Sequence, residues 1–224
     1  MENSDKFFIA VYTCHAKRYC DDVFFRRLGK IAGEAYISIV DNSQNTEYIF
    51  KLIHLAKKYL KNYNVAHLNI EPGSRIFLRS VGDSVKFLQK EFLLSDKRFF
   101  LTLETDVIPL KDDLLETFYL IRNVADIIGG IYYQPLHHPD EWFESGHAEF
   151  IDSAVFSGCT MYNRHVLTKL QFRYDLNNPG VFPDSFMHID AKAKNFRSIL
   201  YTGIKCKHIH KGNGSRGHEE VKDD

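Results

Sequence analysis

The chain has 224 residues, 44% of them hydrophobic and 26% charged, which is enough to bury one sizeable core. Lysine plus arginine equals aspartate plus glutamate at 29 each, so the overall charge favours neither nucleic acid nor an anionic membrane as a partner. The sequence has no apolar run long enough to span a bilayer and no secretory signal pattern at its start, so we expect a cytoplasmic protein. The cysteines are scattered, without the close pairs of a zinc knuckle or a redox dithiol, and their spacing leaves disulfides open.

Predicted strands and helices alternate through the first half of the chain. The apolar residues 7–13 predict a strand, and residues 21–31 predict a helix with Phe24, Leu28 and Ile31 on one face. The pattern repeats with a strand at 35–40, a helix at 46–61, a strand at 65–70, a helix from 83 or 84, a strand at 99–103 and a helix at 111–122. This alternation favours an α/β fold with a mostly parallel central sheet flanked by helices, because parallel strands need helical crossovers.

Helical spacing also predicts the apolar faces of the second and third helices. Asp83 or Ser84 can accept hydrogen bonds from free backbone N–H groups, so we expect the third helix to begin there. The expected inner positions are Ile49, Ile53, Ala56 and Leu60 in the second helix, and Val85, Leu88 and Phe92 in the third.

Beyond residue 127 the alternation breaks. A strand at 127–133 is followed by a long segment, 134–153, that is rich in histidine, acidic and aromatic residues, and such segments are usually functional or mobile. An apolar stretch at 155–161, a helix at 184–195, a strand at 199–204 and a glycine-rich, charged flexible tail at 211–224 complete the chain. No linker composition separates the halves, so we expect a single domain over residues 1–210.

An acidic triplet stands where the apolar strand at 99–103 ends. Glu104 and Asp106 are separated by Thr105, and the two-residue period of a strand would aim both carboxylates the same way. Mg²⁺ and Mn²⁺ often take one or two carboxylates and complete their shell with substrate phosphates and water. In an alternating α/β fold, ligands bind at the carboxyl ends of strands, which favours a metal site over a solvated strand end or a turn cap at Asp106.

Together with the ends of the first two strands, this triplet resembles the nucleotide-sugar-dependent glycosyltransferases of GT-A fold, especially the inverting family 2. The resemblance covers nearly the whole chain and implies a Rossmann-like GT-A fold. Thr13 matches the end of the strand that meets the nucleotide base, Asp41 the acidic residue after the second strand, and Glu104-Thr105-Asp106 the Asp-any-Asp motif. It implies a nucleotide-binding half at 1–105 and a metal and acceptor half at 106–210. Asp41 is equally explained as a turn cap.

A second family signature, an acidic pair that opens a helix and ends at a Gly-Tyr turn, resembles residues 183–197. Asp184 matches the catalytic base of those enzymes, and Asn195-Phe196 matches the turn. Pro183, Phe186 and Asp190 depart from the family pattern, which indicates a distant relative.

The resemblance implies further ligands. A histidine after the last core strand often completes the metal site in similar enzymes, and either His208 or His210 can take that place, with surface histidines as the alternative. The predicted site residues are Thr13, Asp41, Arg75, Arg79, Thr105 and Asp106 for the donor, Glu104, Asp106, His208 and His210 for Mn²⁺ or Mg²⁺, Asp184 for catalysis, and Trp142, Ser157 and Gly158 for the acceptor. Solvated surface arginines and a core-packing tryptophan are the alternatives for Arg75, Arg79 and Trp142.

We therefore expect a metal-dependent glycosyltransferase that moves a sugar from a nucleoside diphosphate sugar, with UDP favoured, to a hydroxyl of an unidentified glycan, lipid-linked or protein acceptor. The metal motif does not distinguish inverting from retaining enzymes, because both kinds share it. The expectation of inversion therefore depends on Asp184 acting as the base. One alternative is a sugar-nucleotide nucleotidyltransferase, although residues 13–18 lack the glycine-rich loop of that class. Another is a non-catalytic carbohydrate-binding relative, which the departures around Asp184 favour.

Overall fold

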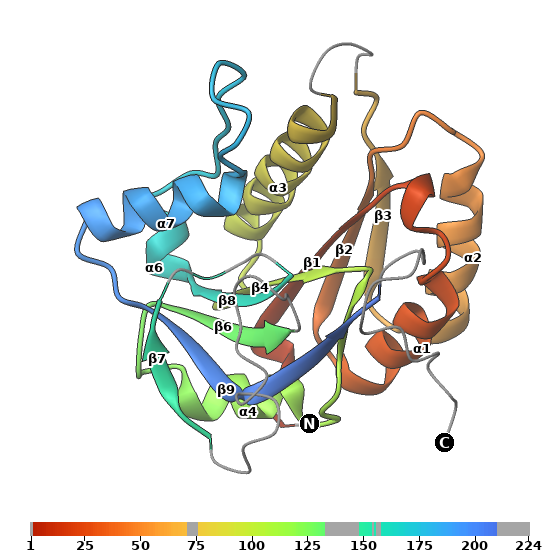
Figure 1. The fold of residues 1–224 in the computed structure, drawn as a ribbon. Helices are drawn as coiled ribbons and strands as arrows, with labels where there is room; N and C mark the ends of the chain where they lie inside the picture. The colour runs from red at the N-terminus through yellow and green to blue at the C-terminus, as the bar shows by residue number, and fades with distance from the viewer. Residues whose placement is uncertain (1, 71–75, 133–147, 154, 156–157, 210–224) are drawn as a thin grey trace.

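A computed structural model of the chain describes residues 2–70, 76–132, 148–153, 155 and 158–209. The strands are β1 (Phe7–Thr13), β2 (Tyr36–Asp41), β3 (Tyr63–His67), β4 (Phe99–Glu104), β5 (Val107–Pro109), β6 (Ile127–Tyr132), β7 (Phe150–Asp152), β8 (Cys159–Asn163) and β9 (Ser198–His208). The helices are α1 (Asp21–Ile31), α2 (Tyr48–Tyr59), α3 (Ile76–Leu94), α4 (Leu114–Ile121), α6 (Arg164–Leu167) and α7 (Pro183–Ala193), with 3-10 turns η1 (Ser4–Lys6) and η2 (His15–Lys17). The described strands form one sheet in the order β3-β2-β1-β4-β8-β6-β9-β5, with β7 beside β9 (Figure 1).

The strands of the first half are parallel. β1 lies between β2 and β4 and runs parallel to both, and β3 continues the sheet beyond β2. A helix makes each connection: α1 joins β1 to β2, α2 joins β2 to β3, and α3 precedes β4. The predicted single-domain α/β fold with a mainly parallel sheet and flanking helices is confirmed.

The second half of the sheet mixes directions, and this mixture brings distant segments together. β8 is antiparallel to both β4 and β6, whereas β9 is parallel to β6. β5 follows the acidic triplet directly and is antiparallel to β9, with Val107 opposite His208. The end of β9 therefore lies beside the residues that leave β4.

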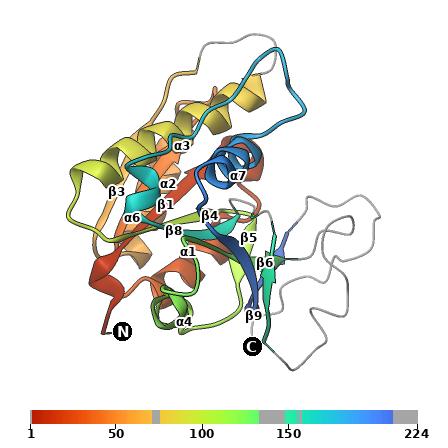
Figure 2. The ribbon, with the colours of Figure 1, turned by 90° about the vertical axis from the view of Figure 1, so that its left-hand side faces the viewer.

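Alternate residues of β1 enter two hydrophobic clusters, one on each face of the sheet. Phe7, Ile9 and Val11 pack with buried residues of α1, α2 and α4. Phe8 and Ala10 pack on the opposite face with residues of α3, α6 and α7, and Figure 2 shows α3 and α7 near each other. Every residue of β1 is buried, which explains its continuous apolar sequence. None of the helices in the described segments has the length and apolar composition needed to cross a membrane.

The expected inner face of α2 is confirmed in part: Ala56 and Leu60 are buried, but the rest of the face is rotated. Ile53 is 41% exposed, and the buried residues of α2 are Tyr48, Leu52, Leu55 and Ala56. Both sets follow helical spacing, so periodicity alone did not separate them. Tyr48 decides the orientation, because its hydroxyl donates to the buried Asp21 Oδ1 at 2.7 Å and so directs this face toward α1.

The expected start of α3 is also wrong, although its inner face of Val85, Leu88 and Phe92 is confirmed as buried. α3 already includes Ile76, so Asp83 and Ser84 lie inside the helix. Ser84 is buried and accepts a hydrogen bond from Asn42 Nδ2 at 3.0 Å, an interaction with β2's end that sequence spacing does not reveal.

Candidate functional site

The acidic triplet lies at the carboxyl end of β4, beside the carboxyl end of β1. Tyr12 pairs with Glu104 in the parallel register, which places Thr13 next to Thr105. The hydroxyls of Thr13 and Thr105 are 3.0 Å apart and both residues are buried. The two threonines join the strand ends and fix where the flanking carboxylates emerge.

The ammonium of Lys17 lies between the two carboxylates of the triplet. Lys17 Nζ is 2.7 Å from Glu104 Oε2 and 2.7 Å from Asp106 Oδ1. The hydroxyl of Tyr12 donates to Glu104 Oε1 at 2.7 Å, so both oxygens of Glu104 are engaged. Burial opposes the positive charge of Lys17, but the two carboxylates outweigh burial and raise the pKa of Lys17 above its ordinary value.

His208 approaches Asp106 from the end of β9. Its Nε2 is 3.7 Å from Asp106 Oδ2, and the backbone N–H of Ile209 donates to the Asp106 carbonyl at 2.7 Å. Burial alone would raise the pKa of Asp106, but the interactions with His208 and Lys17 lower it below its ordinary value. Asp106 is therefore held as a carboxylate.

These residues have the chemistry of a divalent cation site. Two carboxylates offer the oxygen ligands that Mg²⁺ and Mn²⁺ take, and the lysine ammonium places one positive charge between them. Within the described segments, no group of three or more histidine, cysteine, aspartate or glutamate side chains is gathered closely enough to hold an ion. A metal shell here would need a donor beyond Glu104 and Asp106, and His208 is adjacent.

A pocket of about 390 Å³ opens beside Lys17 and Glu104. The carboxyl ends of β1 and β2 form one side of it, and the first turns of α3 form the other. Asn42 joins the two sides, because its Nδ2 donates to Ser80 O at 3.2 Å as well as to Ser84. The described lining residues are Tyr12, Thr13, Cys14, His15, Ala16, Lys17, Asn42, Ser43, Gln44, Asn45, Ile76, Phe77, Ser80, Val81 and Glu104.

Asp41 accepts hydrogen bonds from Ser43, which lines this pocket. Its Oδ1 accepts from the backbone N–H of Ser43 at 2.9 Å and from the Ser43 hydroxyl at 2.6 Å. Its Oδ2 is 2.9 Å from His67 Nδ1, and the side chain is fully buried. The turn contact expected as the alternative for Asp41 is thus present, while direct donor contact stays a prediction.

Asp184 lies in the first turn of α7 and shares an electrostatic neighbour with the triplet. Burial raises the pKa of Tyr132 well above its ordinary value, and the negative charges of Glu104 and Asp184 raise it further. The Tyr132 ring lies 5.6 Å from the His208 ring, edge to face. A Cβ at Gly158 would be 2.9 Å from Tyr132 Cζ, so the glycine leaves room for this tyrosine. Tyr132 therefore connects the surroundings of Glu104, His208 and Asp184.

The turn after α7 contains a residue with a left-handed backbone. Asn195 has a φ of 60°, and among the described residues no other non-glycine residue has a positive φ. Glycine adopts this left-handed region most readily and asparagine tolerates it, which explains Asn195 where similar enzymes have glycine. The departing residue Asp190 instead forms an ion pair with Arg173 at 2.7 Å.

Of the remaining predicted donor residues, Arg79 is described and takes no part in the contacts around the triplet. Arg79 lies half-buried in α3 and is absent from the described lining of the pocket. Arg75, Trp142, Ser157 and His210 lie outside the described residues, so their assignments stay predictions.

Sequence reasoning missed Lys17 and Tyr132. A basic residue shortly after the first strand, where ligands bind in α/β folds, was an available signal for Lys17. Tyr132 gave no such signal, because its place beside His208 depends on the register of β6 with β9 and on the space left by Gly158.

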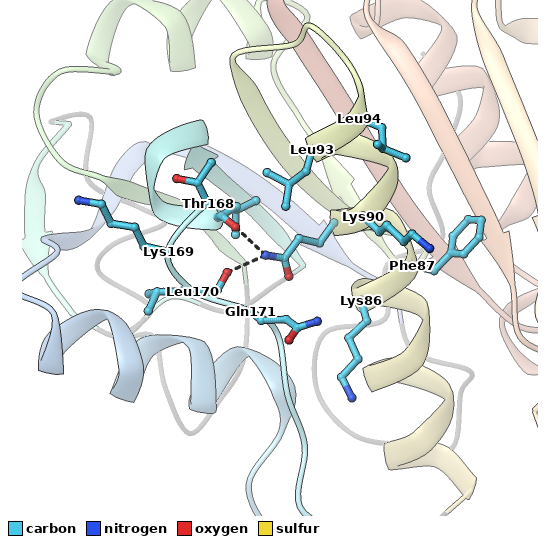
Figure 3. Close-up of a pocket in the computed structure, with 11 residues that line it drawn as sticks. Lys86, Phe87, Lys90, Leu93, Leu94, Thr168, Lys169, Leu170 and Gln171 are labelled. Atoms are coloured by element: carbon cyan, nitrogen blue, oxygen red, sulfur yellow. Dashed lines mark hydrogen bonds between the residues drawn. The ribbon is translucent and has the colours of Figure 1, made fainter.

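A second hollow of about 570 Å³ lies between α3 and residues 167–171, away from the triplet (Figure 3). Gln89 lines it and donates to Leu167 O at 3.0 Å and Leu170 O at 2.6 Å. Lys86, Lys90 and Lys169 line it, and its described lining contains no carboxylate or histidine. Its described lining therefore lacks the carboxylate and the histidine that line the smaller pocket.

No protein-family profile matches the sequence, and no curated protein matches it by sequence. Solved structures nevertheless share its fold. TarS 1–349 from S. aureus has a TM-score of 0.64 at 16% identity, over 91% of this chain and 60% of that chain. The mannosyltransferase PcManGT from Pyrobaculum calidifontis, in complex with GDP-Man and Mn²⁺, has a TM-score of 0.66 at 11% identity, over 91% of this chain and 56% of that chain. Glucosyl-3-phosphoglycerate synthase from Mycobacterium tuberculosis has a TM-score of 0.57 at 10% identity, over 95% of this chain and 75% of that chain.

The chain therefore has the GT-A fold of nucleotide-sugar glycosyltransferases, as its sequence motifs predicted. At these identities the likeness establishes the fold. The chain spans about 60% of the length of TarS 1–349 and 56% of the mannosyltransferase.

Proposed function

We propose that this chain is a metal-dependent glycosyltransferase that moves a sugar from a nucleoside diphosphate sugar to an acceptor hydroxyl. The observation that carries the proposal is the pair of carboxylates, Glu104 and Asp106, beside a pocket at the carboxyl ends of β1 and β2. The fold supports it, since TarS with UDP-GlcNAc and a mannosyltransferase with GDP-Man share this arrangement of elements.

The pocket has separate surfaces for the parts of such a donor. Ile76 and Phe77 offer apolar area for a nucleobase, and the polar turn after β2 offers hydrogen-bonding groups for base and ribose. Lys17 lines the pocket beside Glu104, where a diphosphate would find a positive charge. We favour uridine as the base, and we retain Thr13, Asp41, Arg75, Arg79 and Thr105 as the remaining donor residues.

Asp106, with Glu104 and His208 or His210, would hold Mn²⁺ or Mg²⁺. When bound, the ion neutralises charge on the departing nucleoside diphosphate. The low pKa of Asp106 keeps its carboxylate ready for a cation at neutral pH, and Thr105 fixes its backbone against β1.

Asp184 acts in this proposal as the base that removes the proton from the acceptor hydroxyl while that oxygen attacks the anomeric carbon. A single displacement of this kind inverts the anomeric centre. Asp184 is half-buried, and its Oδ1 accepts the backbone N–H of Ser185 at 2.8 Å, which orients the carboxylate at the start of α7. Trp142, Ser157 and Gly158 are the proposed acceptor contacts, and residues 1–105 and 106–210 the donor and acceptor halves.

A thermal-shift screen of nucleoside diphosphates with and without Mn²⁺ tests the proposal. A bound ligand raises the apparent stability by mass action, so we expect one nucleotide to raise the Tm more when Mn²⁺ is present. With that nucleotide's sugar donor, the chain should release nucleoside diphosphate. Failure of every nucleotide to shift the Tm, with or without metal, would contradict donor binding.

Asp106→Asn supplies the matched variant for this assay. The substitution removes one carboxylate charge at nearly constant volume, so we expect release of nucleoside diphosphate to fall on the order of 100-fold, the scale of losing one electrostatic contact to a transition state. Asp112→Asn is the control, because Asp112 pairs with Arg27 and its side chain is 81% exposed. Equal losses in both variants would count against a role for Asp106.

A further inference from the structure

Lys17 occupies the position that a cation would take between Glu104 and Asp106. Its Nζ is 2.7 Å from an oxygen of each carboxylate, and its side chain is only 19% exposed. One ammonium and two carboxylates leave this cluster with a net negative charge, which attracts a divalent ion. The ammonium and the ion cannot occupy the same position.

We propose that Lys17 is a tethered cation that holds the metal position before the donor binds and exchanges places with the divalent ion when the diphosphate arrives. This inference depends on the proposed function for its diphosphate partner. The charges favour such an exchange. A divalent ion neutralises Glu104 and Asp106 together, and the released ammonium pairs with the anionic diphosphate.

The surroundings of Lys17 allow this movement. Lys17 ends η2, and its flexible four-carbon stem can redirect the ammonium without moving β1. Both Lys17 and Glu104 line the 390 Å³ pocket, so the ammonium can turn into the space where the donor would lie. Without a replacement cation, its departure would leave two neighbouring carboxylates facing each other, which disfavours the move.

The exchange makes metal binding and donor binding cooperative. The ion competes with Lys17 when the donor is absent, and the diphosphate removes that competitor. By thermodynamic linkage the ion must strengthen binding of the diphosphate by the same factor. In the absence of nucleotide, Mn²⁺ should therefore bind weakly to the wild-type chain.

Titration of Mn²⁺ without nucleotide, followed by the electron paramagnetic resonance signal of the free ion, tests the competition. Lys17→Met removes the ammonium but keeps an unbranched apolar stem, so we expect Mn²⁺ to bind at least about tenfold more tightly than to the wild type. Lys61→Met is the control, because Lys61 pairs with Glu34 at 3.0 Å on the exposed surface, outside the described lining of the pocket. Equal affinities of the wild type and Lys17→Met would overturn the proposal.

Two further measurements test whether the charge of Lys17, and not a change in packing or folding, controls the affinity for Mn²⁺. Lys17→Arg keeps the positive charge, so it should bind Mn²⁺ as weakly as the wild type, and tight binding by this variant would overturn the competition. The wild type alone gives the other test: saturating UDP should tighten Mn²⁺ binding beyond what UDP in buffer accounts for. No such tightening, in a chain that binds UDP, would overturn the exchange even if Lys17→Met does not fold.

The Mn²⁺ titration contains no sugar donor, so its result is independent of glycosyl transfer. Tighter Mn²⁺ binding by Lys17→Met, together with no binding of any nucleotide, would support Lys17 as the competitor and reject the proposed function. Donor turnover with equal Mn²⁺ affinity in both chains would reject the inference and retain the proposed function.

Discussion

At the scale of residues, the candidate site depends on buried polar groups whose neighbours fix their charge. Asp106 is 7% exposed yet has a lowered pKa, because Lys17 and His208 outweigh the cost of burial. Tyr132 has a raised pKa, because it is buried near carboxylates. At neutral pH the site therefore presents the Asp106 carboxylate beside a neutral phenol, and the charge of that carboxylate favours cation binding.

Gly158 leaves space for the ring of Tyr132, so a larger residue at this position should displace the ring. In Gly158→Ala the new Cβ would lie 2.9 Å from Tyr132 Cζ and 3.0 Å from its hydroxyl oxygen. We expect the ring to shift at a cost of about 1–3 kcal/mol in the free energy of unfolding. Because the ring contacts His208 and lies near Glu104, release of nucleoside diphosphate should fall as well, about tenfold to 100-fold.

Gly180→Ala is the matched control for this prediction, since a Cβ at Gly180 meets no atom within 4 Å. Its unfolding free energy should stay within about 0.5 kcal/mol of the wild type. Urea unfolding and the nucleotide-release assay measure both effects. A Gly158→Ala chain with wild-type stability and activity would show that Tyr132 has no fixed role.

Parts of the site were predictable from the sequence because their signals are local. Glu104 and Asp106 follow an apolar strand directly, so their position at a strand end was evident from neighbouring residues. Lys17 and Tyr132 act through contacts between segments distant in sequence, such as Lys17 with Glu104. Those contacts depend on strand register, which a single sequence does not specify.

At the scale of elements, the first half of the fold was predictable and particular helix details were not. β1 and α1 match their predicted bounds, because each has one strong apolar pattern and a clear break after it. Two faces of α2 fit helical spacing, and both include Ala56. The hydrogen bond from Tyr48 to Asp21 fixes which of the two faces is buried. α3 extends to Ile76 across Gly82, where a Cβ would be 2.0 Å from Tyr174 Cδ1.

The end of α7 gives an element-scale prediction. Asn195 has a φ of 60°, so an alanine there would have to adopt a left-handed backbone that costs L-residues roughly 1–2 kcal/mol. Asn195→Ala should therefore lower the free energy of unfolding by about that amount, whereas Asn195→Gly should match or exceed the wild type. Urea unfolding of the three chains compares them. An alanine variant as stable as the glycine variant would mean that the turn readily takes another conformation.

At the scale of the whole molecule, one sheet connects the proposed donor and acceptor halves. β4 pairs with β1 on one side and with β8 on the other, so the two hydrophobic clusters extend across residue 105. Residues of the candidate site come from both halves: Lys17 from the first, and Asp106, Tyr132 and His208 from the second. The site therefore requires the halves to fold together.

Calorimetry tests this dependence. Because the sheet and both clusters are shared, we expect a single unfolding transition, and a nucleotide that binds with Mn²⁺ should shift the whole transition upward. At a ligand concentration 100 times its Kd, the gain in free energy of unfolding is about 2.7 kcal/mol. Two resolved transitions, with the ligand shifting one alone, would instead indicate that residues 1–105 and 106–210 are independent folding units. Asp106→Asn, measured in parallel, should retain the single transition but lose most of the metal-dependent shift, because it alters the ligand set while keeping Thr105 and β4 in place.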